Sequence, residues 1–282
     1  MFEPDEIETA ACPVCNSNDF QVAYDRFKPY LVVQCQSCSV YYLSPRPSEE
    51  AARKHYMSGD YFTDNKFGYS DYQSQEKNLR ATFRRFLQNL KKASLDGGSL
   101  LDVGCGNGYL LAEAKPLFDR RVGLELDPQA AATAAKHCDH IFKEPVDLLP
   151  ATEKFNCITA INVIEHIYRP IDFLSHLRNH LQPNGSLVIA TPDMGSFWRR
   201  LMGGGWPSFK IPEHILFFNR QNLESLFNKA GFTTATPISF PHAFPLSLVA
   251  SKLHLSLPSF CSNIQVWIPQ TMTAVYGVNN GR

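Results

Sequence analysis

The chain has 282 residues, 44% of them hydrophobic, and its 27 basic and 27 acidic side chains give a formal net charge of zero. This apolar content can fill a large core and excludes a mainly disordered protein. The zero net charge argues against an enzyme that acts on nucleic acids, because phosphate contacts demand a basic surface. The sequence shows no signal peptide and no run of 18 apolar residues, so we expect a cytoplasmic protein without a transmembrane helix.

Two Cys-x-x-Cys pairs dominate the N-terminal part of the chain. One pair is Cys12 and Cys15, the other is Cys35 and Cys38, and 19 residues separate them. This spacing is typical of zinc sites in which a hairpin brings two knuckles around one tetrahedral ion. Four thiolates leave no open coordination position, so we predict a structural Zn²⁺ in a small ribbon over residues 1–46. The alternative is a set of four unrelated buried thiols.

Residues 47–97 are predicted to form a helical connector. Ser48 is a candidate N-cap for a first helix, and residues 76–92 carry apolar side chains at helical spacing. The stretch between these two helices is rich in aromatic residues. It is interpreted either as a lid that closes over a bound cofactor, with Tyr61 as a contact, or as aromatic packing onto the main domain.

A glycine-rich turn follows an apolar strand that is predicted over residues 99–103. Gly104, Gly106 and Gly108 permit positive φ and remove Cβ atoms from a turn that a ligand approaches closely. The spacing differs from the dinucleotide fingerprint G-x-G-x-x-G, whose third glycine position is here Tyr109. The turn therefore favours a ligand other than a dinucleotide.

Two carboxylates near this turn indicate the charge of the ligand. Asp102, two residues before the first glycine, would repel a pyrophosphate but favour an ammonium and a sulfonium group. S-adenosylmethionine carries both groups and has no phosphate. Glu125 ends the next predicted strand, 21 residues after Gly104, which is about the distance at which a carboxylate meets ribose hydroxyls. We expect Glu125 and the adjacent Leu126 to contact this cofactor.

This combination of acids and glycines resembles class I S-adenosylmethionine-dependent methyltransferases. The resemblance extends over about residues 98–193. It implies a Rossmann-like, doubly wound α/β fold with a seven-stranded sheet, which we assign to residues 98–282. It also includes the stretch Asn162-Val-Ile-Glu-His166, which follows a predicted buried strand. The resemblance implies that Asn162 contacts the cofactor, and His166 is interpreted either as a catalytic residue or as a structural one.

The adjacent residues Glu213 and His214 are a second pattern that indicates a catalytic function. The arrangement Glu-His-x-x-x-Phe resembles a segment of zinc-containing sugar C-methyltransferases and polysaccharide-cluster methyltransferases, which share the Cys₄ unit. We predict His214 as a general base oriented by Glu213, because a neutral imidazole near pH 7 suits deprotonation of a hydroxyl or of a carbon beside a carbonyl. The alternative is an imidazole that merely packs under Phe217 and Phe218.

The predicted reaction is methyl transfer to a small-molecule acceptor. A sugar or sugar nucleotide of surface-polysaccharide or secondary-metabolite biosynthesis is the first choice. A quinone-like or lipid phenol is the second, suggested by the apolar helical face of residues 246–257 within an insertion at about residues 241–268. The same face is a candidate for peripheral membrane contact. A scaffold that binds S-adenosylmethionine without catalysis is the alternative from another class.

Overall fold

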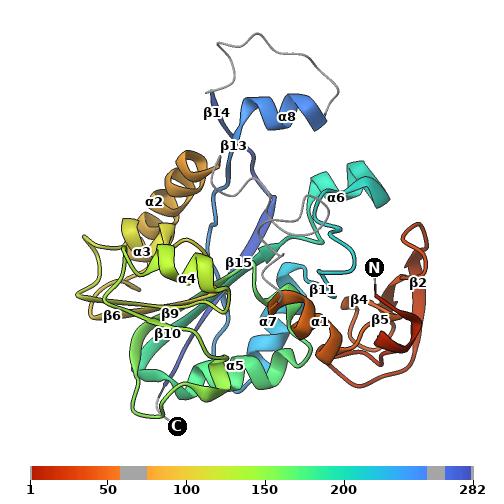
Figure 1. Cartoon of the computed structure of the whole chain (residues 1–282), viewed down its shortest axis with the longest axis horizontal. Coiled ribbons are helices and arrows are strands. Elements are labelled where there is room, and N and C mark those ends of the chain that lie inside the picture. The colour runs from red at the N-terminus through yellow and green to blue at the C-terminus, as the bar shows by residue number, and fades with distance from the viewer. Residues whose placement is uncertain (1, 58–74, 253–263, 281–282) are drawn as a thin grey trace.

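A seven-stranded sheet lies at the centre of the computed structural model, which describes residues 2–57, 75–252 and 264–280 (Figure 1). From one edge to the other, the strands follow the order β12 (Thr236–Pro237), β15 (Met272–Val278), β10 (Leu181–Pro192), β9 (Phe155–Ile161), β6 (Ser99–Val103), β7 (Arg120–Leu124) and β8 (His140–Phe142). Strands β6 to β10 run parallel, and β15 is antiparallel to β10. The predicted doubly wound seven-stranded fold is therefore confirmed.

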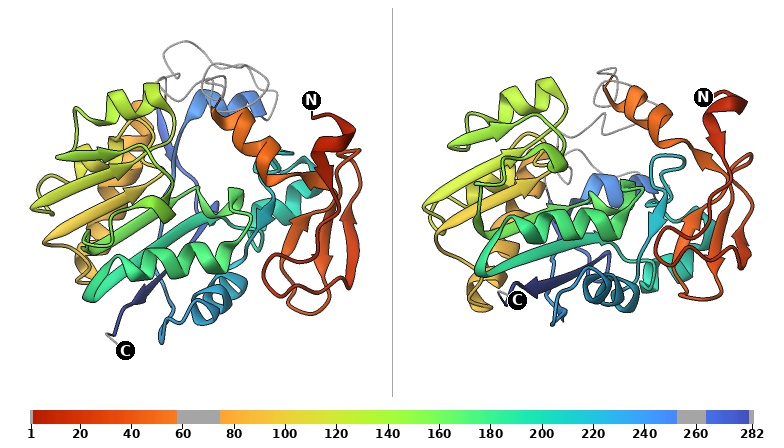
Figure 2. Two further views of the ribbon diagram at one scale, coloured as in Figure 1. Left: turned by 60° about the horizontal axis from the view of Figure 1, so that its bottom comes forward. Right: turned by 90° about the horizontal axis from the view of Figure 1, so that it is seen from below.

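Helices cover both faces of this sheet (Figures 1 and 2). One face packs against α2 (Glu76–Lys92) and α3 (Tyr109–Glu113), whereas the other packs against α5 (Pro170–Asn179) and α7 (Arg220–Lys229). Successive strand residues alternate between the two cores, as expected for a sheet that is buried on both faces: Leu100 and Leu101, Cys157 and Ile158, Leu187 and Val188.

The order of the strands determines where a ligand can bind. Strand β6 has β7 on one side and β9 on the other, so the chain reverses its direction of winding at β6. In open α/β sheets, ligands bind at such a switch point, outside the carboxyl ends of the strands. The glycine turn follows β6 and leads into α3, whereas α4 (Pro128–Ala134) follows β7 and is capped by the Asp127 side chain, which accepts from Ala130 N at 2.7 Å.

The N-terminal sheet includes a strand from the far end of the chain. Its order is β11 (Leu216–Phe217), β4 (Tyr41–Leu43), β3 (Val32–Cys35) and β2 (Phe20–Tyr24). Strand β11 belongs to the region assigned to the methyltransferase domain, and Leu216 pairs with Tyr42. Figure 2 shows this N-terminal unit standing to one side of the central sheet. The unit is thus joined to the larger domain by backbone pairing.

The remaining elements connect these two units and form the insertion. Strand β1 (Ile7–Glu8) pairs with β5 (Arg46–Pro47), and the Ser48 side chain accepts from Ala51 N at the start of α1 (Glu49–Met57), as predicted. The insertion contains α8 (Leu246–Lys252) and, on either side of it in the chain, the antiparallel strands β13 (Ala243–Pro245) and β14 (Gln265–Trp267).

Some predictions on these segments have other outcomes. Strand β12, at one edge of the central sheet, has only two residues. Residues 253–257 of the predicted apolar helix, like Tyr61 of the predicted lid, lie outside the described residues. Within the described residues, no helix combines the length and the apolar character that crossing a membrane requires.

Candidate active site

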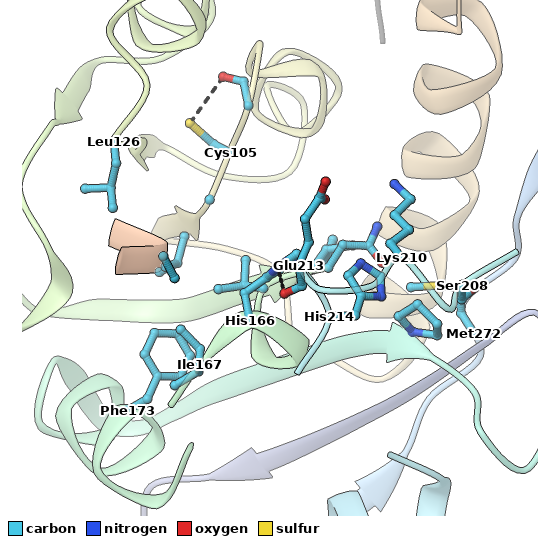
Figure 3. A pocket seen from close by; sticks show the side chains of 18 of the residues that line it. Cys105, Leu126, His166, Ile167, Phe173, Ser208, Lys210, Glu213, His214 and Met272 are labelled. Atoms are coloured by element: carbon cyan, nitrogen blue, oxygen red, sulfur yellow. Dashed lines mark hydrogen bonds between the residues drawn. The ribbon is translucent and has the colours of Figure 1, made fainter. Parts of the chain in front are cut away.

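A cavity of about 1040 Å³ opens at the carboxyl ends of β6, β7 and β9 (Figure 3). The wall contains nearly all of the predicted catalytic and cofactor-binding residues that lie in the described part of the chain: Asp102, Gly104, Gly106, Glu125, Leu126, Asn162, His166, Glu213 and His214. Gly108 is not part of the wall. The cavity therefore brings together residues that are separated by more than 100 positions in the sequence.

Two glycines of the turn, Gly104 and Gly108, lie against other parts of the protein. Gly104 and Gly108 adopt φ of +67° and +78°, a left-handed backbone that favours glycine. A Cβ atom at Gly104 would lie 2.6 Å from Cγ2 of Val163, and one at Gly108 would lie 2.9 Å from Cα of Ala134. These two glycines thus allow the turn to pack against its own protein. The prediction that all three clear space for a ligand is accordingly modified for Gly108.

Two buried carboxyl groups lie beside this turn. Glu125 accepts from Gly106 N and from Asp127 N, both at 2.9 Å, which fixes its carboxylate at the end of β7. Asp102 accepts from the Thr159 hydroxyl at 2.7 Å. Burial and the charge of Glu125 raise the pKa of Asp102 to about 7, against the lowering effect of the Thr159 hydrogen bond. A cation bound in the cavity would favour the ionised form of both groups.

Two imidazoles form another part of the cavity wall. His166 lies in the short 3₁₀ helix η3 (Ile164–His166), and its ring centroid is 4.8 Å from that of His214, with the rings nearly perpendicular at 88°. His166 Nδ1 is 3.0 Å from the backbone oxygen of Glu213. Because a carbonyl oxygen only accepts, Nδ1 carries the proton and Nε2 presents a lone pair. Burial lowers the pKa of His166 to about 4 and that of His214 well below its usual value.

Glu165 completes this wall, and the sequence analysis did not select it. Its Oε2 accepts from the Thr191 hydroxyl at 3.0 Å, and its carboxylate lies within 4.8 Å of ring nitrogens of both His166 and His214. Burial raises the pKa of Glu165 to about 7. In contrast, the carboxyl group of Glu213 extends away from His214 in Figure 3. Its position in the sequence could have identified Glu165, because it directly precedes His166 shortly after the buried strand β9.

The glycine run before Trp206 is folded rather than left as an open loop. Gly203–Gly205 form the 3₁₀ helix η4 after α6 (Phe197–Met202). Trp206 is only 5% exposed, and its ring meets that of Phe209 at a centroid distance of 5.2 Å. Trp206 also lines the cavity, so this segment supplies an aromatic wall.

The four N-terminal thiols form a separate cluster. Their sulfur atoms lie within 4.8 Å of one another, with the shortest separations, 3.4 and 3.5 Å, between Cys12 and Cys38 and between Cys15 and Cys35. Zn–S bonds of about 2.3 Å in a tetrahedron place sulfur atoms roughly 3.8 Å apart. Asn16 and Ser39 adopt positive φ and close the two knuckles by bonds to Cys12 O and Cys35 O. This donor set fits a structural Zn²⁺.

Comparison with known proteins identifies the family. A family model described as a methyltransferase domain matches residues 72–236. This protein is a member of the methyltransferase-domain family. Solved structures share its fold: an S-adenosylmethionine-dependent methyltransferase from Thermotoga maritima (TM-score 0.52, 19% identity, 75% of this chain and 97% of that chain) and one from Archaeoglobus fulgidus (TM-score 0.52, 15% identity, 74% and 97%).

Curated relatives of this methyltransferase are named ubiquinone biosynthesis O-methyltransferase. The relative from Cereibacter sphaeroides is 29% identical over 148 residues, which are 48% of this chain and 60% of the relative. The mitochondrial relative from Schizosaccharomyces pombe is 32% identical over 131 residues, 43% of this chain and 45% of the relative. The chain thus spans about half of the length of these relatives. The predicted methyltransferase class is confirmed, whereas the predicted sugar acceptor has no support from these relatives.

The observed cavity fits S-adenosylmethionine as the methyl donor of this methyltransferase. Asp102 and Glu125 offer two carboxylates for a ligand with an ammonium and a sulfonium group, and the glycine turn lies against the same space. The ammonium and sulfonium groups of such a ligand would compensate the charges of two buried acids, which a phosphate would not do.

The Asp102→Asn variant is expected to gain stability at pH 8 and to lose cofactor affinity. The folded pKa of Asp102, about 7, lies above the ordinary value of 3.8, so its favourable contribution is complete below pH 3.8 and is lost as the pH rises through 7. Asparagine avoids this loss, which is on the order of a few kcal/mol, and still accepts from Thr159. Its affinity for S-adenosylmethionine should fall roughly 10-fold to 100-fold.

Denaturant unfolding at pH 5 and pH 8 and calorimetric titration with S-adenosylmethionine measure the two effects of Asp102→Asn. The gain in unfolding free energy should be larger at pH 8 than at pH 5. Binding at pH 8 as tight as in the natural protein would show that Asp102 does not face the cationic end of the cofactor.

Proposed function

We propose that this methyltransferase transfers a methyl group from S-adenosylmethionine to a hydroxyl group of a ring-bearing, largely apolar acceptor such as a quinone-like phenol. The observation that carries the proposal is the position of two neutral imidazoles. They line the same cavity as the glycine turn, Asp102 and Glu125. An acceptor hydroxyl bound between the cofactor and His214 would have the methyl group on one side and a proton acceptor on the other.

The residues of the chain have three tasks in this reaction. Bound S-adenosylmethionine supplies a methyl group on a sulfonium, which is already a good leaving group. The protein therefore has to bind both reactants, align them and remove a proton from the acceptor. His214 is 2% exposed, and burial together with its neighbours His166 and Lys210 lowers its pKa, so the ring is neutral and a ring nitrogen can accept a hydrogen bond from the acceptor hydroxyl as its proton leaves.

Aromatic and aliphatic side chains of the cavity support an apolar ring as the acceptor. The wall includes the flat or apolar side chains of Tyr168, Phe173, Trp198, Trp206 and Met272. Flat side chains of this kind stack on rings and exclude water, which strengthens electrostatic interactions at the reacting atoms. The names of the curated relatives also support a quinone-like acceptor and transfer to oxygen.

A sugar or sugar nucleotide is the second candidate acceptor. It is supported by the resemblance of the segment around His214, by the Cys₄ unit, and by the cationic side chains of Arg53 and Lys210 in the wall of the cavity. Such cations could bind the diphosphate of a nucleotide sugar. An apolar phenol makes no use of these charges, so the two candidates predict different acceptor preferences.

Product analysis with two acceptor series tests the proposal. The purified protein is incubated with methyl-labelled S-adenosylmethionine and either catechol-type phenols with alkyl chains of increasing length or a panel of nucleotide sugars. We expect label on the phenol oxygen, with kcat/KM rising with chain length because more apolar surface is buried. Label on sugars alone would replace the first candidate by the second. Binding of S-adenosylhomocysteine without any product in either series would favour a non-catalytic scaffold.

A further inference from the structure

Three side chains of the active site meet at one point without hydrogen bonding to one another. The carboxylate of Glu165 and ring nitrogens of His166 and His214 all lie within 4.8 Å of each other. The residues come from η3 and from the segment just before β11, which are close because Ile215 N donates to Glu165 O at 2.9 Å. This backbone bond holds the two segments together and keeps the three side chains facing each other.

Several polar atoms in this group lack a partner. Glu165 is 1% exposed and His214 is 2% exposed. Among the described residues, Oε1 of Glu165 and the ring nitrogens of His214 make no hydrogen bond of good geometry, although the backbone of Ser208 lies close enough to the His214 ring to raise its pKa against the effect of burial. A buried carboxylate oxygen and a buried imidazole that remain unpaired cost free energy, so such a group calls for a ligand.

The hydrogen bonds made by the remaining polar atoms of Glu165 and His166 match those that metal-binding residues usually make. Histidine ligands usually donate their second ring N–H to a carbonyl or carboxylate, and carboxylate ligands are themselves hydrogen-bonded. His166 Nδ1 donates to Glu213 O at 3.0 Å, which leaves Nε2 for an ion. Thr191 donates to Oε2 of Glu165 at 3.0 Å, which leaves Oε1 for the same ion.

We propose that Glu165, His166 and His214 bind a divalent transition-metal ion, distinct from the ion of the four cysteines. Two imidazoles and one carboxylate suit Zn²⁺, Co²⁺ or Fe²⁺ better than Mg²⁺ or Ca²⁺, which prefer oxygen ligands. Bonds of about 2.1 Å place such ligand atoms roughly 3.4 Å apart. The three candidate ligand atoms lie within 4.8 Å of one another, so side-chain rotation has to bring them closer to reach that geometry. Three protein ligands leave a further coordination position, and His166 and His214 both line the cavity.

The role of this ion rests on the proposed function, although its binding does not. An acceptor hydroxyl that approaches the open position would lose its proton more readily, because a bound cation stabilises the oxyanion. The oxygen then forms a bond to the methyl carbon as the bond from sulfur to carbon breaks, and the hydroxyl proton leaves to solvent. In the metal-loaded protein His214 is thus a ligand, and in the metal-free protein it remains available to accept the proton.

Cobalt titration of the full chain tests the site, because the two ions have different spectra. Co²⁺ bound by thiolates gives an intense charge-transfer absorption, whereas Co²⁺ bound by nitrogen and oxygen gives only weak visible bands. We expect about two Co²⁺ per chain for the natural protein and about one for Glu165→Gln and His214→Ala, with the thiolate absorption unchanged. The matched control is His180→Ala, which removes a buried histidine whose Nδ1 bonds to Glu153 O, outside the cavity wall.

Each outcome of this titration decides the proposal. Titration with S-adenosylhomocysteine and thermal unfolding verify that each variant is folded. A single Co²⁺ per chain in the natural protein, with only the thiolate spectrum, overturns the second site. If the natural protein binds a single Co²⁺ but Glu165→Gln still loses turnover, the carboxylate of Glu165 interacts directly with the imidazoles, and the proposed function stands without the second ion. Two ions per chain without methylation of any acceptor would leave the site valid and reject the proposed function.

Discussion

The His214→Ala variant is expected to bind S-adenosylhomocysteine within a few-fold of the natural protein while its turnover falls by about 10²–10⁴. The hydrogen bonds that Asp102 and Glu125 accept from Thr159, Gly106 and Asp127 do not involve His214, so the substitution leaves them in place. Turnover falls because the variant lacks either the proton acceptor or an ion ligand. Calorimetric titration and steady-state kinetics with the acceptor identified by product analysis measure the two quantities.

A matched control separates this chemical effect from a loss of packing. His180 is 7% exposed and His214 is 2% exposed, so truncating either removes a buried imidazole. His180→Ala should lower thermal stability but keep kcat within a few-fold. Equal losses of turnover in both variants, or a loss of cofactor affinity in His214→Ala, would contradict the assignment of His214 to the reaction.

Local sequence patterns were sufficient to predict the cofactor half of this site. The strand Ser99–Val103, the turn at Gly104 and the next strand are consecutive in the chain, and the Rossmann-like βαβ unit places them side by side. The positions of Asp102 and Glu125 at strand ends follow from that unit alone. Prediction of the fold succeeded for the same reason, since parallel strands that are buried on both faces appear as short apolar runs.

The acceptor half depends on contacts that no local pattern encodes. Strand β11 has only two residues and exists because Leu216 and Phe217 pair with β4, more than 170 positions earlier in the chain. Glu165 gains its place beside His214 through the same long-range packing. The acid next to His214 in sequence, Glu213, instead gives its backbone oxygen to His166. The predicted orientation of His214 by Glu213 stays a prediction, whereas the carboxylate that lies near ring nitrogens of both imidazoles is that of Glu165.

The cysteine unit is linked to the imidazole wall by a continuous backbone path. Leu43 N, at the end of β4, donates to Ile215 O at 2.9 Å, and Ile215 N donates to Glu165 O at 2.9 Å. Ile215 directly follows His214 and is 1% exposed. The N-terminal sheet thus supports the segment that carries His214, which gives the proposed structural zinc an influence on the reaction without contact to either substrate.

The Cys35→Ser variant is therefore expected to lose turnover by at least about 100-fold and to retain most of its cofactor affinity. Zinc contributes roughly 10 kcal/mol or more to the folding of small Cys-rich units, so a three-ligand site should leave the N-terminal sheet unfolded. Without β4, the segment around Ile215 loses its pairing, and His214 is no longer held opposite the cofactor. Within the described parts of the chain, no backbone hydrogen bond joins the turn after β6 to the cysteine unit.

Metal analysis, cofactor titration and kinetics of Cys35→Ser test this coupling. A substitution is preferable to a chelator, since a chelator would also remove an ion from Glu165, His166 and His214. The control is Cys138→Ser, a partly buried thiol near α4 whose Sγ lies 3.4 Å from Ala134 O. Full turnover in zinc-depleted Cys35→Ser would show that the ribbon does not position His214. Parallel loss of cofactor binding and turnover would show instead that the whole chain unfolds with the ribbon.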